Sequence, residues 1–274
     1  VTTRNSVMKH LKTYQLFEAQ SVLTADQEAF LNEYTDGTWT YNPATGLVDV
    51  KGGFDCFNKK LGDFKGVRFG KVSGLFDCSW NNLASLEGAP QKVGWDFNCK
   101  QNNLTSLEGA PQKVGGYFNC KQNNLASLEG APQEVSGSFD CSENKLTSLA
   151  GAPQEVDGDF DCSENKLTSL AGAPQEVDGD FKCDAFELEK EEWNPKGWLK
   201  VLKEGSPEAQ KLILTILSAE VLNKEIAKDP AGMAMKLKGV WNDEVFKKTR
   251  AKLVWPRGYE EEAGLVGDLD DVGF

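Results

Sequence analysis

The stretch FNCKQNNLTSL, residues 97–107, decides the fold, because close copies of it follow one another along half of the chain. Its cysteine returns at positions 78, 99, 120, 141, 162 and 183, so that each step is 21 residues long. A fixed period of about 20 to 30 residues is typical of solenoids, in which every copy forms one coil of a stack. The sequence therefore predicts a solenoid of about seven coils between residues 54 and 186.

Aligned on the cysteine, the copies read F-x-C-x-x-N-x-L-x-x-L-x-G-x-P-x-x-V. This pattern resembles the leucine-rich repeat, L-x-L-x-x-N-x-L, with Phe and Cys at the first two leucine positions. The resemblance implies an α/β fold, a leucine-rich-repeat solenoid with a parallel sheet on its concave face. The asparagine is kept in five successive copies, at Asn81, Asn102, Asn123, Asn144 and Asn165. Lys59 and Phe186 replace it in the terminal copies, as expected of capping units.

The physical chemistry of a strand agrees with this resemblance. Alternate side chains of a strand share a face, so Phe97 and Cys99 are expected inside the coil and Asn98 outside. Stacked copies then bury a continuous column of Phe, Cys and Leu. The asparagine amide is expected to bind backbone groups that the turn after each strand leaves unpaired. Gly and Pro in each copy start a return path, which has room only for short 3₁₀ or extended segments.

The cysteines are predicted to be small buried hydrophobes. Equivalent cysteines of neighbouring coils lie about 4.8 Å apart with parallel Cβ directions, whereas a disulfide needs Cβ atoms at about 3.5 to 4.5 Å. A flat row of sulfur atoms is also a poor tetrahedral cage for zinc. We therefore expect no disulfide, no metal and a reducing compartment.

Composition restricts the partners and the location. The 274 residues carry a net charge of −12, which disfavours nucleic acid and anionic membranes as partners, because both attract clustered Lys and Arg. No run reaches the roughly 18 apolar residues of a membrane span. Residues 1–20 lack the apolar centre of a signal peptide, so we expect an intracellular protein that is not secreted by that route.

Residues 11–19, LKTYQLFEA, resemble the capsid-targeting peptides of internal head proteins in T-even-type bacteriophages, which begin Met-Lys-Thr-Tyr-Gln. Those peptides end at a prohead-protease site of the pattern (Leu/Ile)-x-Glu-(Ala/Gly), which residues 16–19 match. The resemblance implies cleavage between Glu18 and Ala19, a phage origin, and a place in the host cytoplasm or the virion. Residues 1–20 also have the loose apolar spacing of an amphipathic helix, and both interpretations stay open.

Residues 21–53 are predicted to cover the first coil with a helix and a hairpin. Thr24 and Gln27 form the sequence signature of a capping box, so the helix begins after Thr24 and runs to about Tyr34. The hairpin follows, with its turn at residues 42–46. Without such a cover, the open end of a solenoid leaves its core and its strand edge in water.

After the repeats of residues 54–186, the pattern becomes helical. Residues 187–257 are predicted to form a C-terminal α-helical domain, in which a wide apolar stripe from Leu212 to Ile226 indicates one buried helix. Residues 258–274 are acidic and are expected to form a solvated tail.

The outward positions of the repeat strands are the predicted binding site for a protein partner. One zone contains Leu75, Trp80, Lys100, Tyr117 and Lys121, and exposed Trp and Tyr near basic residues are typical binding hot spots. An acidic floor contains Asp140, Glu143, Asp159, Asp161 and Glu164. Two further candidates are Gln101, in the column of Trp80, and Trp95, which replaces a repeated glycine. The acidic floor fits either a cation site or a solubilising surface, and we expect the latter.

Catalysis is not expected. The chain has one histidine, His10, which lies outside every predicted domain, so histidine acid–base chemistry is nearly excluded. Similar repeats occur in secreted bacterial ubiquitin ligases, whose C-terminal domains use a catalytic cysteine, but residues 184–274 contain no cysteine. A paired-carboxylate hydrolase on the acidic floor would lack a pocket that excludes water. The sequence predicts a monomeric, cofactor-free protein-binding module, and the alternative is a packaged phage head protein processed after Glu18.

Overall fold

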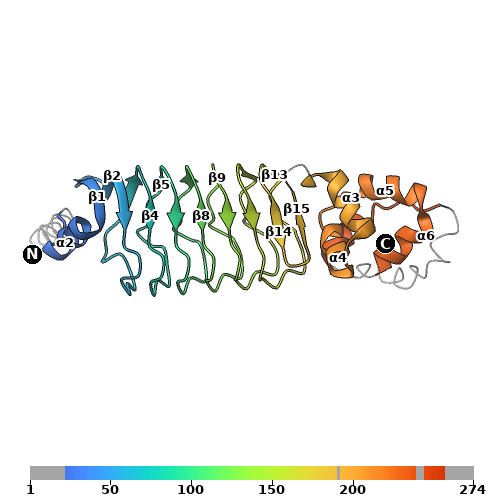
Figure 1. Cartoon of the computed structure of the whole chain (residues 1–274), viewed down its shortest axis with the longest axis horizontal. Coiled ribbons are helices and arrows are strands. Elements are labelled where there is room, and N and C mark those ends of the chain that lie inside the picture. Colours follow the sequence, from blue (N-terminus) through green and yellow to red (C-terminus); the bar gives the residue numbers. More distant parts are fainter. Residues whose placement is uncertain (1–21, 190–191, 239–243, 257–274) are drawn as a thin grey trace, which may run out of the picture.

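The computed structural model describes residues 22–189, 192–238 and 244–256. A rod of stacked coils forms its centre, with a helix and hairpin at one end and a group of helices at the other (Figure 1). The expected cleavage site at Glu18 and Ala19, the alternative amphipathic helix and the acidic tail lie outside the described residues.

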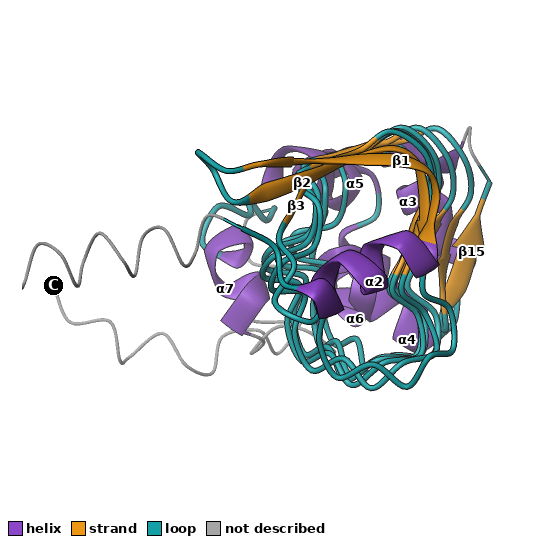
Figure 2. Cartoon of the chain, turned by 90° about the vertical axis from the view of Figure 1, so that its left-hand side faces the viewer, coloured by secondary structure: helices purple, strands orange, loops and turns teal. Residues whose placement is uncertain are grey.

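The rod is straight. Its coils form a straight row in side view (Figure 1) and superimpose closely when viewed along the rod (Figure 2). The repeats therefore present flat sides, and the strand face is not the concave surface that the resemblance implied. With only 21 residues per coil, both sides of the coil are narrow extended segments, so neither side spreads the stack more than the other.

One side of the rod is a parallel sheet that we call the Phe sheet, because a buried phenylalanine begins each strand. It contains β4 (Phe76–Asp77), β6 (Phe97–Asn98), β8 (Phe118–Asn119), β10 (Phe139–Asp140), β12 (Phe160–Asp161) and β14 (Phe181–Cys183). Each strand pairs in register with the equivalent strand of the next coil. The strands are short because the backbone turns into the left-handed region two residues after each of the first six cysteines, as at Trp80 with φ 57° and Gln101 with φ 50°.

A second parallel sheet lies on the return path, where we expected short 3₁₀ or extended segments. This Val sheet contains β3 (Phe69–Val72), β5 (Lys92–Val93), β7 (Lys113–Val114), β9 (Glu134–Val135), β11 (Glu155–Val156) and β13 (Glu176–Val177). The extended alternative is confirmed, but the sheet itself was not predicted. It forms because backbone groups beside each buried valine need partners, and the next coil offers them. Strand β2 (Leu47–Asp55) pairs with both β3 and β4 and so joins the two sheets.

The interior between the sheets follows the predicted columns. Rings of neighbouring phenylalanines stack with centroids 5.1–5.4 Å apart from Phe76 to Phe181. All seven cysteines are buried, which confirms their inward direction, and all are free thiols. Burial raises the pKa of the Cys56 thiol to about 12 and that of Cys183 to about 11, so these thiols stay protonated near neutrality.

The asparagine column binds the backbone as predicted. The side-chain oxygen of Asn102 accepts the N–H of Leu83 at 2.9 Å, and its amide nitrogen donates to the carbonyls of Cys78 and Cys99, both at 3.0 Å. The same bonds recur at Asn81, Asn123, Asn144 and Asn165. One amide thus joins two neighbouring coils, which is why a side chain with both donors and an acceptor is repeated there.

Replacing Asn102 with alanine is expected to lower the free energy of unfolding by about 2–4 kcal/mol, because several buried backbone groups lose their partners at once. Asn103→Ala is the matched control, since Asn103 is exposed, and its cost is expected to stay within about 0.5 kcal/mol. Urea denaturation followed by circular dichroism measures both. Equal losses in the two variants would contradict a structural role for the Asn102 amide.

The N-terminal elements are a helix and an antiparallel hairpin. Helix α2 (Ala25–Tyr34) begins after Thr24 with the predicted capping box to Gln27. Strand β1 (Thr35–Asn42) pairs with β2 around the predicted turn. The rings of Phe30 and Tyr34 lie 5.4 and 6.1 Å from that of Phe54, the first phenylalanine of the stack. Apolar side chains of α2 therefore pack on the first coil.

At the other end, β15 (Phe186–Leu188) pairs antiparallel with β14. The helices that follow are α3 (Pro195–Glu204), α4 (Pro207–Leu214), α5 (Ala219–Lys228), α6 (Pro230–Lys238) and α7 (Glu244–Arg250). The stripe that we assigned to one buried helix is divided between α4 and α5, because Ser218 caps a new helix by accepting the N–H of Val221. None of the helices in the described part of the chain combines the length and apolar character that a membrane crossing requires.

The helices contact the last coil through specific bonds. The ring of Trp193 stacks on Phe181 with centroids 3.8 Å apart, and its indole N–H donates to the carbonyl of Pro174 at 3.1 Å. The N–H of Leu170 donates to the hydroxyl of Thr215 at 2.9 Å. Trp193 thus continues the phenylalanine stack beyond its last repeat.

Candidate protein-binding face

An exposed aromatic pair lies beside the first strands of the Phe sheet. Trp80 is 47% exposed and Phe57 45%, and their ring centroids are 6.4 Å apart in an edge-on arrangement. Both residues follow a cysteine of the stack, where the chain turns outward into its left-handed bend. Phe57 was not among the residues predicted from the sequence, although a signal existed: equivalent positions carry Ser79 and Lys100, so a phenylalanine there is unusual.

Trp95 lies on the opposite border of the Phe sheet and is 68% exposed. The equivalent positions are glycines, because a side chain there meets the previous coil. A Cβ at Gly137, for example, would lie 2.7 Å from the carbonyl carbon of Gly116. Trp95 is the exception in this column, and the hydrogen bond from its N–H to Gly74 is 3.3 Å long. Trp80 and Trp95 therefore lie at opposite borders of the Phe sheet and do not form one cluster.

Tyr117 belongs to the acidic part of the face and not to the zone of Trp80. Its hydroxyl donates to Asp140 in the next coil at 2.9 Å. The two residues line a shallow hollow of about 270 Å³ together with Ser138, Phe139, Asp159, Asp161 and Lys182. Burial and the neighbouring carboxylate of Asp140 raise the pKa of Tyr117 well above its usual value. Tyr117 is therefore a neutral hydrogen-bond donor on an acidic surface.

Asp140 and Asp161 also hold the turn after their strands. One carboxylate oxygen of Asp140 accepts the N–H and the hydroxyl of Ser142 at 2.9 and 2.6 Å. Asp161 binds Ser163 in the same way. Asp159 is exposed, and its carboxylate accepts the N–H of Asp180 at 2.9 Å. The acidic residues are thus fixed in position by the backbone, which makes the hollow a rigid surface.

Lys121 and Glu143 form an ion pair at 2.8 Å on the same face, between neighbouring coils. The bond with Lys121 lowers the pKa of Glu143, and the same bond raises the pKa of Lys121. Glu164 is exposed, with its backbone N–H bound to Asp184 at 2.5 Å.

The remaining candidates are half-buried: Leu75, Lys100 and Gln101. The side-chain oxygen of Gln101 is buried and has no hydrogen-bond partner among the described residues. All three lie along the Phe sheet, but none joins the aromatic pair or the hollow through a bond described above. Leu75, Lys100 and Gln101 are therefore part of the surface of the Phe sheet and belong to neither the aromatic pair nor the hollow.

No group of three or more His, Cys, Asp or Glu side chains in the described ranges is arranged to hold a metal ion. The cysteine side chains are buried in the stack. The described residues of this face offer exposed aromatic rings and fixed carboxylates as contacts. Comparison of the chain with protein-family models, curated proteins and solved structures found no match.

Proposed function

We propose that the protein is a non-catalytic binding module whose Phe sheet takes up a protein partner. The exposed Phe57–Trp80 pair carries this proposal, because two large aromatic rings about half exposed on a rigid face are the side chains that dominate protein interfaces. The acidic hollow supplies a second contact. Its fixed carboxylates and the Tyr117 hydroxyl favour a basic side chain of the partner.

The distance between the aromatic pair and the acidic hollow sets a minimum length for a partner that contacts both. The aromatic pair comes from the first two coils and the hollow from the fourth to the seventh, so their residues are two to six coils apart along the rod. At about 4.8 Å per coil, these separations are about 10–30 Å. A partner that fills both sites must lie along the rod, as a folded protein surface or an extended segment does.

The repeats are, in this proposal, a short form of the leucine-rich repeat, with the N-terminal helix and hairpin as a cap. The contacts of Phe30 and Tyr34 with Phe54 support the cap, since they cover the first phenylalanine of the stack. The Asn column supports the repeat class, because the amide binds backbone groups after each strand.

Two double variants test the binding face separately. Phe57→Ala with Trp80→Ala removes the aromatic pair, and Asp159→Lys with Asp161→Lys reverses the charge of the hollow. Each is expected to weaken capture of the partner by about tenfold or more, the usual cost of losing a hot spot. Met235→Ala is the control, since Met235 is 80% exposed on α6, away from the rod.

The measurement is recovery of co-purifying proteins from the native source with the wild-type chain and the three variants. A partner lost with either face variant and kept with the control supports the proposal. If every protein recovered by the wild type is also recovered by both face variants, the Phe sheet is not the binding face.

The packaged phage head protein remains the alternative function, and its support is the sequence of residues 11–19. The intact mass of the native protein distinguishes the two. A chain that begins at Ala19 supports packaging and processing, whereas a chain that retains the preceding residues in infected cells counts against it.

A further inference from the structure

The outer surface of the Val sheet carries one charged side chain per coil, in a single row. The row reads Lys71, Lys92, Lys113, Glu134, Glu155 and Glu176. Neighbouring members are directly opposite each other in the parallel sheet, and all six are exposed. The first three coils of the row are thus basic and the last three acidic.

This order is unfavourable for an isolated chain. Like charges directly opposite on neighbouring strands repel each other, and the row contains two Lys–Lys and two Glu–Glu neighbours. Only its central pair, Lys113 and Glu134, forms an ion pair within the described structure. The other four side chains present their charges to the surroundings.

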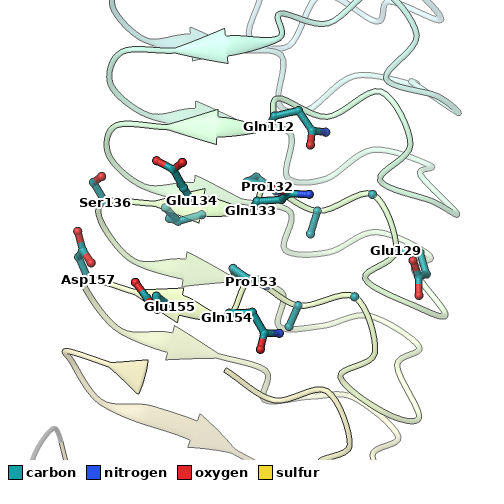
Figure 3. Close-up of a pocket in the computed structure, with 15 residues that line it drawn as sticks. Gln112, Glu129, Pro132, Gln133, Glu134, Ser136, Pro153, Gln154, Glu155 and Asp157 are labelled. Atoms are coloured by element: carbon teal, nitrogen blue, oxygen red, sulfur yellow. The ribbon is translucent and has the colours of Figure 1, made fainter. Parts of the chain in front are cut away.

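The surface around the row carries further polar side chains. Figure 3 shows Glu134 and Glu155 on neighbouring coils, with Gln112, Gln133 and Gln154 in a second row beside them. A hollow of about 740 Å³ lies in this acidic half, and an equivalent hollow of about 970 Å³ lies in the basic half. Because the rod is straight (Figure 1), the strands that carry these six residues follow one another in a straight row, in register.

We propose that this row binds the same row of a second copy of the chain, in antiparallel orientation. Read backwards, three Lys and three Glu become three Glu and three Lys, so the row is complementary to itself. Lys71 then faces Glu176 of the second copy, Lys92 faces Glu155, and Lys113 faces Glu134, each pair occurring twice about a two-fold axis. The spacing matches at every position because both rows have the same coil repeat.

A second copy fits better than an unrelated protein, which would need six charges at the same spacing. Networks of several ion pairs contribute more than isolated surface pairs, whose individual contribution is small. The dimer differs from the monomer that we expected from the sequence. It leaves the Phe sheet, on a neighbouring side of the rod, open to the proposed partner.

Salt provides the first test, on the full-length chain. At about 0.1 M salt, the screening length is about 10 Å, long enough for facing charges to attract while the remote net charge is screened. At about 1 M salt, it falls to about 3 Å, and the pairs weaken. Sedimentation is expected to give a dimer in the first condition and a monomer in the second. A monomer in both conditions at concentrations well above the micromolar range overturns the proposal.

Charge reversal provides the second test. Lys92→Glu and Glu155→Lys are each expected to raise the dimer dissociation constant by about tenfold or more, since each creates two like-charge pairs across the axis. When the two variants are mixed, Glu at 92 of one chain faces Lys at 155 of the other, and every pair is complementary again. A mixed dimer of wild-type affinity is therefore expected.

Lys145→Glu is the matched control, because it makes the same change in net charge at an exposed position away from the row. It is expected to leave the dimer unchanged, and circular dichroism checks that all the variants are folded. A dimer that persists in Lys92→Glu, or a mixture that stays monomeric, contradicts the antiparallel pairing. Such a result would leave the charged row as a by-product of repeat duplication.

Discussion

The free energy of unfolding is expected to fall by about 10 kcal/mol between about pH 8 and about pH 10, because seven buried thiols resist ionisation. Burial raises the pKa of each thiol above its ordinary value of 9.0, to about 11 for Cys183 and about 12 for Cys56. The stabilisation is complete below about pH 8, where folded and unfolded thiols are both protonated. It is lost as the pH rises towards the folded values, since only the unfolded chain then releases protons.

Each thiol accounts for about 1.4 kcal/mol at one pH unit above its unfolded pKa. Because small folded domains are stable by about 5–15 kcal/mol, the rod is expected to unfold within this pH interval. Urea denaturation at a series of pH values, under reducing conditions, measures the loss. Other groups with raised pKa values, such as Tyr117 and Lys121, act in the same direction at higher pH.

Cys120→Ala isolates the contribution of the thiols. Removal of the sulfur costs packing energy at every pH, but the variant has one fewer group to ionise. Its stability is therefore expected to fall less steeply above pH 9.0, by about 1.4 kcal/mol per pH unit. Parallel curves for the wild type and the variant would show that the cysteines do not cause the alkaline loss.

Phe118→Ala is expected to lower the free energy of unfolding by about 3–5 kcal/mol, the usual cost of removing a buried phenylalanine ring. The ring is fully buried and stacks between Phe97 at 5.4 Å and Phe139 at 5.1 Å. Each coil of a solenoid contacts only its neighbours, so a gap in the middle weakens the coupling between the two halves. Unfolding in urea is therefore expected to become less cooperative as well as easier.

Phe57→Ala is the matched control, since it removes the same ring from an exposed position next to Trp80. Its cost is expected to stay within about 1 kcal/mol, with unchanged cooperativity. Comparable losses in the two variants would contradict a stabilising role for the interior phenylalanine stack.

The interior of the fold could be predicted from the sequence because the repeat fixes it. Once a step of 21 residues is recognised, every Phe, Cys and Asn has an equivalent in the next coil, and burial follows from strand alternation. The Val sheet was not predictable in this way. Apart from β3, its strands have two residues and one inward side chain each, as at Lys92 and Val93, which is too short for any periodicity.

The surface positions of the candidate site could be predicted from the sequence, but the contacts between their side chains could not. Trp80, Tyr117 and Asp140 were identified as surface positions, yet their contacts depend on side-chain direction and on the bend after each strand. The left-handed bend is formed by Trp80 and Gln101, residue types that rarely adopt it, so the sequence gives no sign of it. Tyr117 reaches forward to Asp140, a contact between coils that no spacing within one copy reveals.

The regularity of the phenylalanine stack also bears on how such a chain evolves. Each ring meets the same surroundings above and below, so nothing in the middle of the rod specifies how many coils there should be. Unequal recombination can insert or delete a whole copy without creating a new packing problem, and each event changes the length by about 4.8 Å. The packing differs at the two ends of the rod, where Phe54 contacts α2 and Phe181 contacts Trp193, and these contacts define the first and the last coil.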